Sequence, residues 1–274
     1  MTRCAPLVEA LDPSAYGPKA VQLGAAIRAG LPVPDGFAIE YSLVGAVGAG
    51  NAQAAHDLAA EVTARCDDWP YWAVRSSAVG EDSAGASFAG IHKSILGVSG
   101  VADILAAVCE VHASASEGGA VAYRSRMGLD TALHMAVVVQ RLVDSDVGGV
   151  MFTRNPITGA DERVIEASWG LGEVVVSGMV TPDRYVLDPL GRLVESQVGE
   201  KDIAVRRVPS GGTTEQVVPG EAVYTPCLAD PDLAGLHALA LRCDSAFGCT
   251  DHDIEFAIKA GVISLLQRRP ITSA

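Results

Sequence analysis

Two segments of the chain carry residue types that could handle a phosphorylated ligand. The first, 71–98, reads YWAVRSSAVGEDSAGASFAGIHKSILGV, an apolar strand that ends at Arg75 and runs into a loop of small residues. Such a loop lets backbone N–H groups approach a polyanion closely. The second, 253–272, reads DIEFAIKAGVISLLQRRPIT and carries Glu255, Gln267 and Arg269. A guanidinium, a small-residue loop and a carboxylate able to bind Mg²⁺ are the parts that a triphosphate site needs.

The second segment has the pattern of a β-hairpin, which predicts the side chains that share a face. If 259–261 forms a three-residue loop, Ile258 faces Val262, and Ile258 lies on the face opposite to Glu255. The residues expected to share a face with Glu255 are Leu265, Gln267 and Arg269. A loop of two or four residues would break this parity. The same alternation is also typical of a half-buried strand whose polar face simply meets water.

The candidate residues of the first segment, and Lys19, also have plainer interpretations. An arginine at a strand end, such as Arg75, often forms only a surface ion pair. The loop at 84–90 could be an ordinary turn, because a lone glycine-rich loop is a weak signal. Lys19, at the start of an expected helix, could be solvated. His92 is the histidine nearest to the loop, and a loop histidine usually has no more than a polar role.

Composition places the chain among globular proteins and argues against nucleic acid as a partner. Hydrophobic residues make up 49% and charged residues 19% of the 274 residues. The net charge of −13 leaves no basic surface to neutralise a phosphate backbone. The six cysteines show neither a C-x-x-C pair nor zinc-ligand spacing, so we expect reduced thiols. Without a signal-peptide pattern or a long apolar run, the sequence indicates a soluble, cytoplasmic protein and no membrane partner.

Periodicity predicts the elements that position these residues. Helices are expected at 19–29, 51–66, 101–113 and 230–247, the last with Gly248 as its terminator. Strands are expected at 36–39 and 71–74, and in the runs RVIEAS, RYVLD and DIAVRR. The apolar runs 135–140 and 148–153, joined by a turn-like DSD, predict a buried hairpin, and the Gly- and Pro-rich stretch 207–226 predicts an exposed loop. This mixture indicates an α/β or α+β fold.

Taken together, these segments resemble one family. The motifs that carry the resemblance are VRSSAVGEDSAGASFAG, VVVQRLVDSDVGGVMFTRNPITG, EASWGLGEVVVSGMVTPDRYVLD, IEFAIKAGVISLLQRRPIT and the N-terminal AYGPKAVQLGAAIRAGLPVPDGFAI. In this order they resemble the nucleotide-binding domain of pyruvate phosphate dikinase, phosphoenolpyruvate synthase and rifampicin phosphotransferase. The resemblance covers nearly the whole chain.

The resemblance implies an α+β fold of the ATP-grasp type and a phosphotransferase activity. Residues 1–274 would form a single nucleotide-binding domain of two lobes, with the lobe boundary near 140–145, clamping Mg-ATP between β-sheets. In the family ATP is split to AMP, and the β-phosphoryl passes to a histidine on a separate domain. ATP and Mg²⁺ are therefore the expected cofactors.

The resemblance also assigns roles to individual residues. Lys19 and Arg75 would hold the phosphates, and Arg269 would stabilise charge on the transferring phosphoryl group, so these three are the expected catalytic residues. Glu255 and Gln267 would bind Mg²⁺. The remaining expected contacts with ATP are Gly90 and Ser94 on the loop above the phosphates, and Gln140 and Leu142 beside the adenine. Glu166 is a plausible further polar contact.

Several positions depart from the family pattern without removing an expected contact. The segment before Lys19 reads YGPK where two glycines usually precede the lysine, so this loop is expected to be stiffer. Ser94 stands where threonine is usual and keeps the hydroxyl. Lys93 replaces an acid or amide and is expected to add positive charge beside the phosphates. The stretch between GFAI and WAVRSS is short, which indicates that part of a helical insertion is missing.

No segment resembles the phospho-histidine domain or a pyruvate- or drug-binding domain. We therefore expect either a subunit that passes phosphate to a histidine protein or small acceptor in trans, or one domain of a larger enzyme. Two other function classes stay open. A small-molecule kinase or acyl-phosphate ligase would release ADP, and a nucleotide-sensing module would bind Mg-ATP without turnover.

Overall fold

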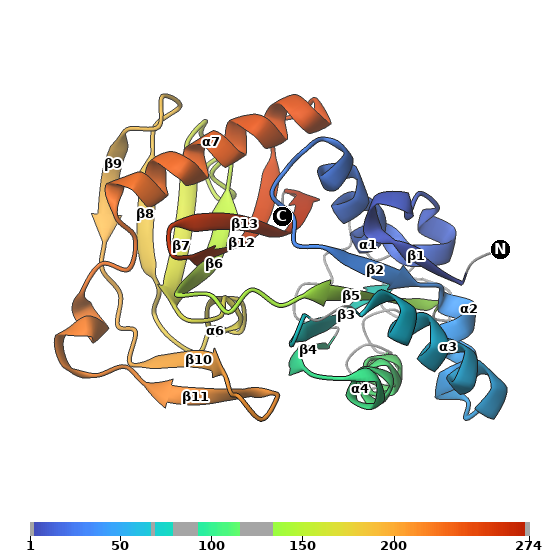
Figure 1. Cartoon of the computed structure of the whole chain (residues 1–274). Helices are drawn as coiled ribbons and strands as arrows, with labels where there is room; N and C mark the ends of the chain where they lie inside the picture. Colours follow the sequence, from blue (N-terminus) through green and yellow to red (C-terminus); the bar gives the residue numbers. More distant parts are fainter. Residues whose placement is uncertain (1–2, 67–68, 79–92, 116–133, 272–274) are drawn as a thin grey trace. The chain divides into compact units, whose positions relative to one another are not determined.

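The computed structural model describes residues 3–66, 69–78, 93–115 and 134–271 (Figure 1). The chain divides into two compact units, each built around its own antiparallel sheet. Unit 1 comprises Met1–Ala25, Asp35–Leu142 and Val208–Gly212, and unit 2 comprises Ala26–Pro34, Val143–Arg207 and Thr213–Ala274. Helices and antiparallel sheets occur in both units, which confirms the predicted α+β class.

Unit 1 contains a five-stranded antiparallel sheet with the order β1-β2-β5-β3-β4 (Figure 1). Its strands are β1 (Cys4–Pro6), β2 (Gly36–Ile39), β3 (Trp72–Ala78), β4 (Ser94–Val98) and β5 (Met135–Arg141). The two central strands, β3 and β5, are buried almost throughout, in keeping with their runs of apolar and small residues. Their burial makes this sheet a rigid support for the polar residues it carries.

Three helices of unit 1 cover one face of this sheet. They are α2 (Tyr41–Gly48), α3 (Ala52–Arg65) and α4 (Val101–Ser114), of which α3 and α4 confirm the predicted helices. The buried side chains of α3, Ala54, Leu58 and Val62, recur every four residues and join one hydrophobic cluster with Val74 of β3. The Asn51 side chain accepts a hydrogen bond from the Ala54 N–H at 3.0 Å and so caps the helix start.

The first helix is interrupted near its start. α1 spans Pro13–Arg28 and follows a short 3₁₀ turn, η1 (Leu7–Glu9), but Gly17 within it has φ +73° and is not helical. A Cβ at this position would lie 2.1 Å from the Ser77 carbonyl oxygen of β3, so only glycine fits. The regular helix therefore resumes at Pro18, a residue suited to a first turn. The helix predicted from residue 19 is confirmed.

Unit 2 contains a six-stranded antiparallel sheet with the order β13-β12-β6-β7-β8-β9 (Figure 1). Its strands are β6 (Val147–Phe152), β7 (Arg163–Trp169), β8 (Asp183–Leu187), β9 (Leu193–Gln197), β12 (His252–Lys259) and β13 (Val262–Pro270). A separate hairpin pairs β10 (Ile203–Arg207) with β11 (Thr213–Val217). Two short helices complete the connections, α6 (Glu173–Val176) and η2 (Gly220–Tyr224).

Helix α7 (Asp230–Phe247) runs across the strands of the six-stranded sheet and contacts β12 and β13 (Figure 1). The Asp232 carboxylate accepts a hydrogen bond from the Ala229 N–H at 2.9 Å, which fixes the helix start. Gly248 ends the helix in the left-handed conformation. Both ends confirm the prediction from the sequence.

Two predictions about local structure are wrong. The apolar runs 135–140 and 148–153 do not pair with each other, because β5 pairs with β2 and β3, and β6 pairs with β7 and β12. The intervening residues instead lead from unit 1 to unit 2, with the change at Leu142. The stretch 207–226 is not simply a loop, since it contains β11, whose side chains are all exposed. Exposure on both faces removes the apolar alternation by which a strand is recognised.

The sequence predicted reduced cysteines and no membrane-spanning segment, and the described residues bear on both predictions. No disulfide links any of the six cysteines, all of which the structure describes. Within the ranges that the structure describes, none of the helices combines the length and apolar character needed to cross a membrane.

Candidate functional site

Lys19 is held against β3 by the break in α1. Its ammonium group is buried and donates a hydrogen bond to the Ser76 carbonyl oxygen at 2.7 Å. The Ser77 hydroxyl donates to the Tyr16 carbonyl oxygen at 2.8 Å and accepts from the Ala20 N–H at 3.2 Å, which fastens the chain on both sides of Gly17. Lys19 therefore lies beside the residue that follows Arg75, in a position set by Gly17.

Arg75 lies in the middle of β3 rather than at its end, so the predicted strand boundary is wrong. It pairs directly with Ser94 of β4, and Gln140 of β5 pairs with Ala73 of β3. Directly paired residues share a face, and so do residues two apart along a strand. Arg75, Ser94 and Gln140 therefore occupy one face of the unit 1 sheet, opposite to the face that packs on α2, α3 and α4.

The remaining residues of unit 1 that we expected near ATP are Leu142, Gly90 and Lys93. Leu142 follows β5 directly, and its N–H donates to the Tyr71 carbonyl oxygen at 3.0 Å. Gly90 lies outside the described residues, as does most of the loop that carries it. Lys93 is exposed and forms an ion pair with Glu110 of α4, so its charge is compensated by a carboxylate that the sequence did not link to it.

The C-terminal hairpin places Gln267 and Arg269 on the face of Glu255, as predicted, although by a different route. The turn contains two residues, because Lys259 pairs with Val262, and not the three that we predicted. A bulge then shifts the register by one residue, after which Glu255 pairs directly with Gln267. Leu265 pairs with Phe256 and so lies on the face opposite to Glu255, which corrects its predicted position.

Arg269 lies on the same face as Gln267 and pairs directly with Asp253. Its Nε donates to the Asp253 carboxylate at 2.7 Å. Burial raises the pKa of Asp253, although the Arg269 guanidinium acts in the opposite direction. Sequence reasoning missed Asp253. The alternating acids of the segment D-I-E could have indicated it, because Asp253 and Glu255 must share a strand face.

Glu166 lies on the same face of the unit 2 sheet. It pairs with Val150 of β6, and Val150 pairs on its other side with Glu255 of β12. The two carboxylate-bearing residues are therefore separated by one strand. Within unit 2 the sheet gathers Glu255, Gln267, Arg269, Asp253 and Glu166 on a single face. The polar residues of unit 1 form their own set on the unit 1 sheet.

The unit 2 set has the chemistry of a partial magnesium site. A carboxylate and an amide oxygen directly opposite each other are hard oxygen ligands, which Mg²⁺ prefers. Among the described residues, no group of three or more His, Cys, Asp or Glu side chains could hold a metal ion. Glu255 and Gln267 could supply two oxygen ligands, and Mg²⁺ that accompanies a nucleotide takes its other ligands from water and phosphate.

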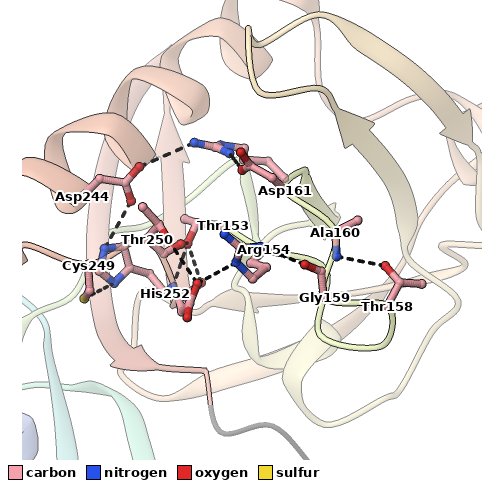
Figure 2. A network of polar contacts seen from close by, with 12 residues as sticks. Thr153, Arg154, Thr158, Gly159, Ala160, Asp161, Asp244, Cys249, Thr250 and His252 are labelled. Carbon is pink, nitrogen blue, oxygen red and sulfur yellow. Dashed lines mark hydrogen bonds and ion pairs between the residues drawn. The ribbon is translucent and has the colours of Figure 1, made fainter.

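A polar network lies at the start of β12, next to this set (Figure 2). The imidazole of His252 is fully buried between the Asp244 carboxylate, 3.3 Å from Nε2, and the Cys249 thiol, 3.9 Å from Nδ1 (Figure 2). Arg268 Nε donates to His252 Nδ1 at 2.9 Å. Because Nδ1 accepts this bond, the proton of the neutral ring lies on Nε2, facing Asp244. Asp244 also lies 3.5 Å from Arg163 Nη2 of β7.

This network predicts a loss of stability in mild acid. Burial and the neighbouring Arg268 guanidinium lower the pKa of His252 from 6.5 to about 4. Between these values the unfolded chain binds a proton that the folded chain does not, so the free energy of unfolding falls as the pH falls. Across this pH range the protonation of His252 lowers the free energy of unfolding by about 3 kcal/mol in total.

Urea unfolding of the wild type and of His252→Gln between pH 4 and pH 7 measures this effect. We expect the difference in unfolding free energy between the two proteins to shrink in acid. The comparison with the variant is needed because burial raises the pKa of Asp244 and of Asp253, which has the opposite sign. A difference that stays constant over this range would contradict the assignment of a neutral, buried imidazole.

The two units together define a class of protein, an α+β domain whose antiparallel sheets carry polar and charged side chains on one face. Residues 52–274 match the family described as "Pyruvate phosphate dikinase, AMP/ATP-binding domain". This match covers most of the chain, so the chain belongs to that family. Lys19 lies outside the matched range.

Individual relatives agree with this membership. The chain is 44% identical to a probable phosphoenolpyruvate synthase of Methanothermobacter thermautotrophicus, over 74% of this chain and 30% of the relative. It is 32% identical to a probable phosphoenolpyruvate synthase of Archaeoglobus fulgidus, over 97% and 41%. It is 39% identical to a rifampicin phosphotransferase of Streptomyces, over 79% and 25%. The chain thus spans less than half the length of each of these relatives.

One solved structure resembles the fold at a greater distance. An L-amino acid ligase from Bacillus licheniformis aligns with 94% of this chain and 43% of its own, with a TM-score of 0.42 and 10% identity. We draw no conclusion from so distant a likeness.

Proposed function

We propose that this chain is the nucleotide-binding part of an ATP-dependent phosphotransferase. It splits ATP to AMP and phosphate, with one water consumed, and passes the β-phosphoryl to a histidine on a separate domain or partner protein. Membership of the AMP/ATP-binding family supports the nucleotide. Two of the relatives named above, a probable phosphoenolpyruvate synthase and a rifampicin phosphotransferase, support the reaction class.

One observation carries the proposal. On the C-terminal hairpin, Glu255 lies directly opposite Gln267, and Arg269 lies on the same face beside Asp253. Oxygen ligands for a cation next to a guanidinium suit a phosphoryl group that gains negative charge during transfer. A half-buried strand with a polar face needs no such selection of residue types.

The residues divide the work in this proposal. Lys19 and Arg75 hold the phosphates from unit 1, where Ser94 shares the face of Arg75. Glu255 and Gln267 hold Mg²⁺, which when bound neutralises phosphate charge. Arg269 stabilises the transferring phosphoryl group, and the Asp253 carboxylate orients its guanidinium.

The adenine contacts are proposed at the end of β5. Gln140 is buried and shares the face of Arg75, and Leu142 follows at the last residue before unit 2. Gly90 completes the proposed set above the phosphates.

Analysis of the nucleotide products tests the proposal. The chain is incubated with Mg-ATP, first by itself and then with a desalted lysate or with a panel of small metabolites, and AMP is separated from ADP. AMP formed only with the macromolecular fraction supports transfer to a histidine partner. ADP formed with a small metabolite contradicts the proposed reaction and indicates a kinase or ligase. Binding of Mg-ATP without turnover in every mixture indicates a nucleotide sensor.

Glu255→Ala should weaken the binding of Mg-ATP about 10- to 100-fold, because a charged ligand contributes on the order of 1.5–3 kcal/mol. Isothermal titration calorimetry at fixed free Mg²⁺ measures this change. Glu215→Ala, on the fully exposed strand β11, is the matched control and should bind normally. Unchanged affinity in Glu255→Ala would remove Glu255 from the metal site.

A further inference from the structure

Arg268 stands between two proposed site residues but points away from them. Side chains alternate along a strand, so Gln267 and Arg269 share one face of β13 and Arg268 lies on the other. Arg268 is only 5% exposed. A buried guanidinium needs specific partners, because the loss of its hydration is costly.

Those partners come from α7, the turn after it and β12. Arg268 Nε and Nη2 lie 2.9 and 2.7 Å from His252 Nδ1, and Nη2 donates to the Cys249 sulfur at 3.1 Å. The guanidinium carbon lies 4.2 Å from the centre of the Phe247 ring, a cation–π distance. The Asp244 carboxylate lies on the other side of the His252 ring, 3.3 Å from Nε2. The planar fork of arginine therefore fixes the end of β13 in both position and orientation.

This fixation matters because the register of β13 changes just before the site residues. From Lys259 to Phe256 the paired residues follow the two-residue turn, and the bulge then inserts Leu266. A bulge re-aims the side chains that follow it. The direction of Gln267 and Arg269 therefore depends on whether the bulge is kept.

The residue types of this strand also permit a register without the bulge. Without the bulge the turn would place Arg268 opposite Asp253 and Leu266 opposite Glu255. Arg268 would then take the site face, and Gln267 and Arg269 would turn to the opposite face, since a slip of one residue exchanges the two faces of a strand. Adjacent arginines allow either of them to pair with Asp253, so the carboxylate does not distinguish the two registers.

We propose that Arg268 is a positioning residue, which selects the bulged register of β13 by docking between His252, Cys249 and Phe247 and so aims Gln267 and Arg269 at the nucleotide. This inference rests on the proposed function for the roles of Gln267 and Arg269. The pocket accepts a planar cation on the side away from the site. Arg268 reaches this pocket from the position opposite Ile254, and only the bulged register places an arginine at that position, since the other register would place Gln267 there.

Turnover by Arg268→Met tests the proposal, since methionine keeps the apolar stem and removes the fork. We expect kcat to fall at least tenfold and the KM for ATP to change less than threefold, because misdirected groups lose transition-state contacts first. Arg268→Lys keeps the positive charge but not the planar guanidinium, so its kcat should lie between those of the wild type and Arg268→Met. Arg154→Met is the matched control, because Arg154 pairs with Asp251 at 2.8 Å and should leave kcat unchanged.

A double-mutant cycle separates positioning from simple loss of stability. If Arg268 aims Arg269, then Arg269→Ala should cost much less in kcat on the Arg268→Met background than on the wild type. Additive losses, or an Arg268→Met protein with the wild-type kcat, would overturn the proposal. If Arg268→Met does not fold, the same cycle is run with Arg268→Lys.

Amide hydrogen exchange of residues 262–270 gives a readout that does not depend on activity. Loosening or altered protection confined to this strand in Arg268→Met supports the positioning role, and wild-type protection excludes it. If the wild type shows no nucleotide binding or turnover, the proposed function fails, and the exchange data still decide whether Arg268 fixes β13.

Discussion

Lys201→Met should lower the free energy of unfolding by about 3–5 kcal/mol, because it leaves a buried carboxylate without its cation. Lys201 and Asp183 are both 0% exposed, and the Lys201 ammonium lies 2.6 Å from the Asp183 carboxylate. The ammonium also donates to the carbonyl oxygens of Val223 at 3.0 Å and Gly199 at 3.3 Å. All of its protons therefore have acceptors inside the protein.

Asp183 is tied to its surroundings as firmly as Lys201. It accepts hydrogen bonds from the N–H groups of Cys227 at 2.7 Å and Gly199 at 2.8 Å, and from the Tyr185 hydroxyl at 3.1 Å. Burial acts to raise the pKa of Asp183, but Lys201 and these N–H groups outweigh burial and lower it. The carboxylate thus stays charged in the folded state, and removing Lys201 exposes the full cost of its burial.

Urea unfolding at neutral pH measures the loss. The matched control is Lys259→Met, which removes a lysine of the same type from an ion pair of similar length, 2.7 Å to Asp146, with side chains 50% and 49% exposed. That change should cost less than about 1 kcal/mol. The double variant Lys201→Met with Asp183→Asn should lose less than the sum of the single changes. A loss below 1 kcal/mol in Lys201→Met would show that the pair is hydrated.

The second expected result concerns turnover. Arg269→Ala should reduce kcat by about 10³-fold while weakening nucleotide binding less than about tenfold, since charge on the transferring phosphoryl group is greatest in the transition state. The contact with Asp253 at 2.7 Å holds the guanidinium in one orientation and so keeps it ready for that charge.

Steady-state kinetics and equilibrium binding separate the two effects. Arg192→Ala, an exposed arginine paired with Asp188, is the matched control. Arg269→Ala also leaves Asp253 buried, so Arg269→Ala combined with Asp253→Asn should regain stability without regaining turnover. Equal losses of turnover and affinity would mean that Arg269 only holds the ground-state phosphates.

Residue patterns were sufficient to predict those features that depend on residues close together in the sequence. The helix at 51–66 followed from its alanine-rich composition, and α7 followed from its capping residues and Gly248. The residue types of the C-terminal hairpin were also sufficient to nominate Glu255, Gln267 and Arg269. These features depend on backbone preferences and side-chain chemistry that act within a few residues.

Pairing between distant strands could not be obtained in this way. The runs 135–140 and 148–153 look like one hairpin, yet β5 and β6 belong to different sheets. The sequence does not reveal this, because both runs are apolar and either could pair with several partners. The ion pair between Arg269 and Asp253 likewise depends on a bulge that composition does not reveal. Register is fixed by packing across the whole sheet, and a shift of one residue reverses every face.

The sequence was therefore sufficient to predict which residue types the candidate site contains, but it was not sufficient to predict how those residues are arranged in space. Five ordered motifs carried the resemblance to a family, and that resemblance implied a class of ligand and roles for Lys19, Arg75, Glu255, Gln267 and Arg269. Folding alone placed Arg75 opposite Ser94 and brought Asp253 to Arg269. It also buried Arg268 on the far face of β13, because contacts between distant segments select one register among several that the local sequence allows.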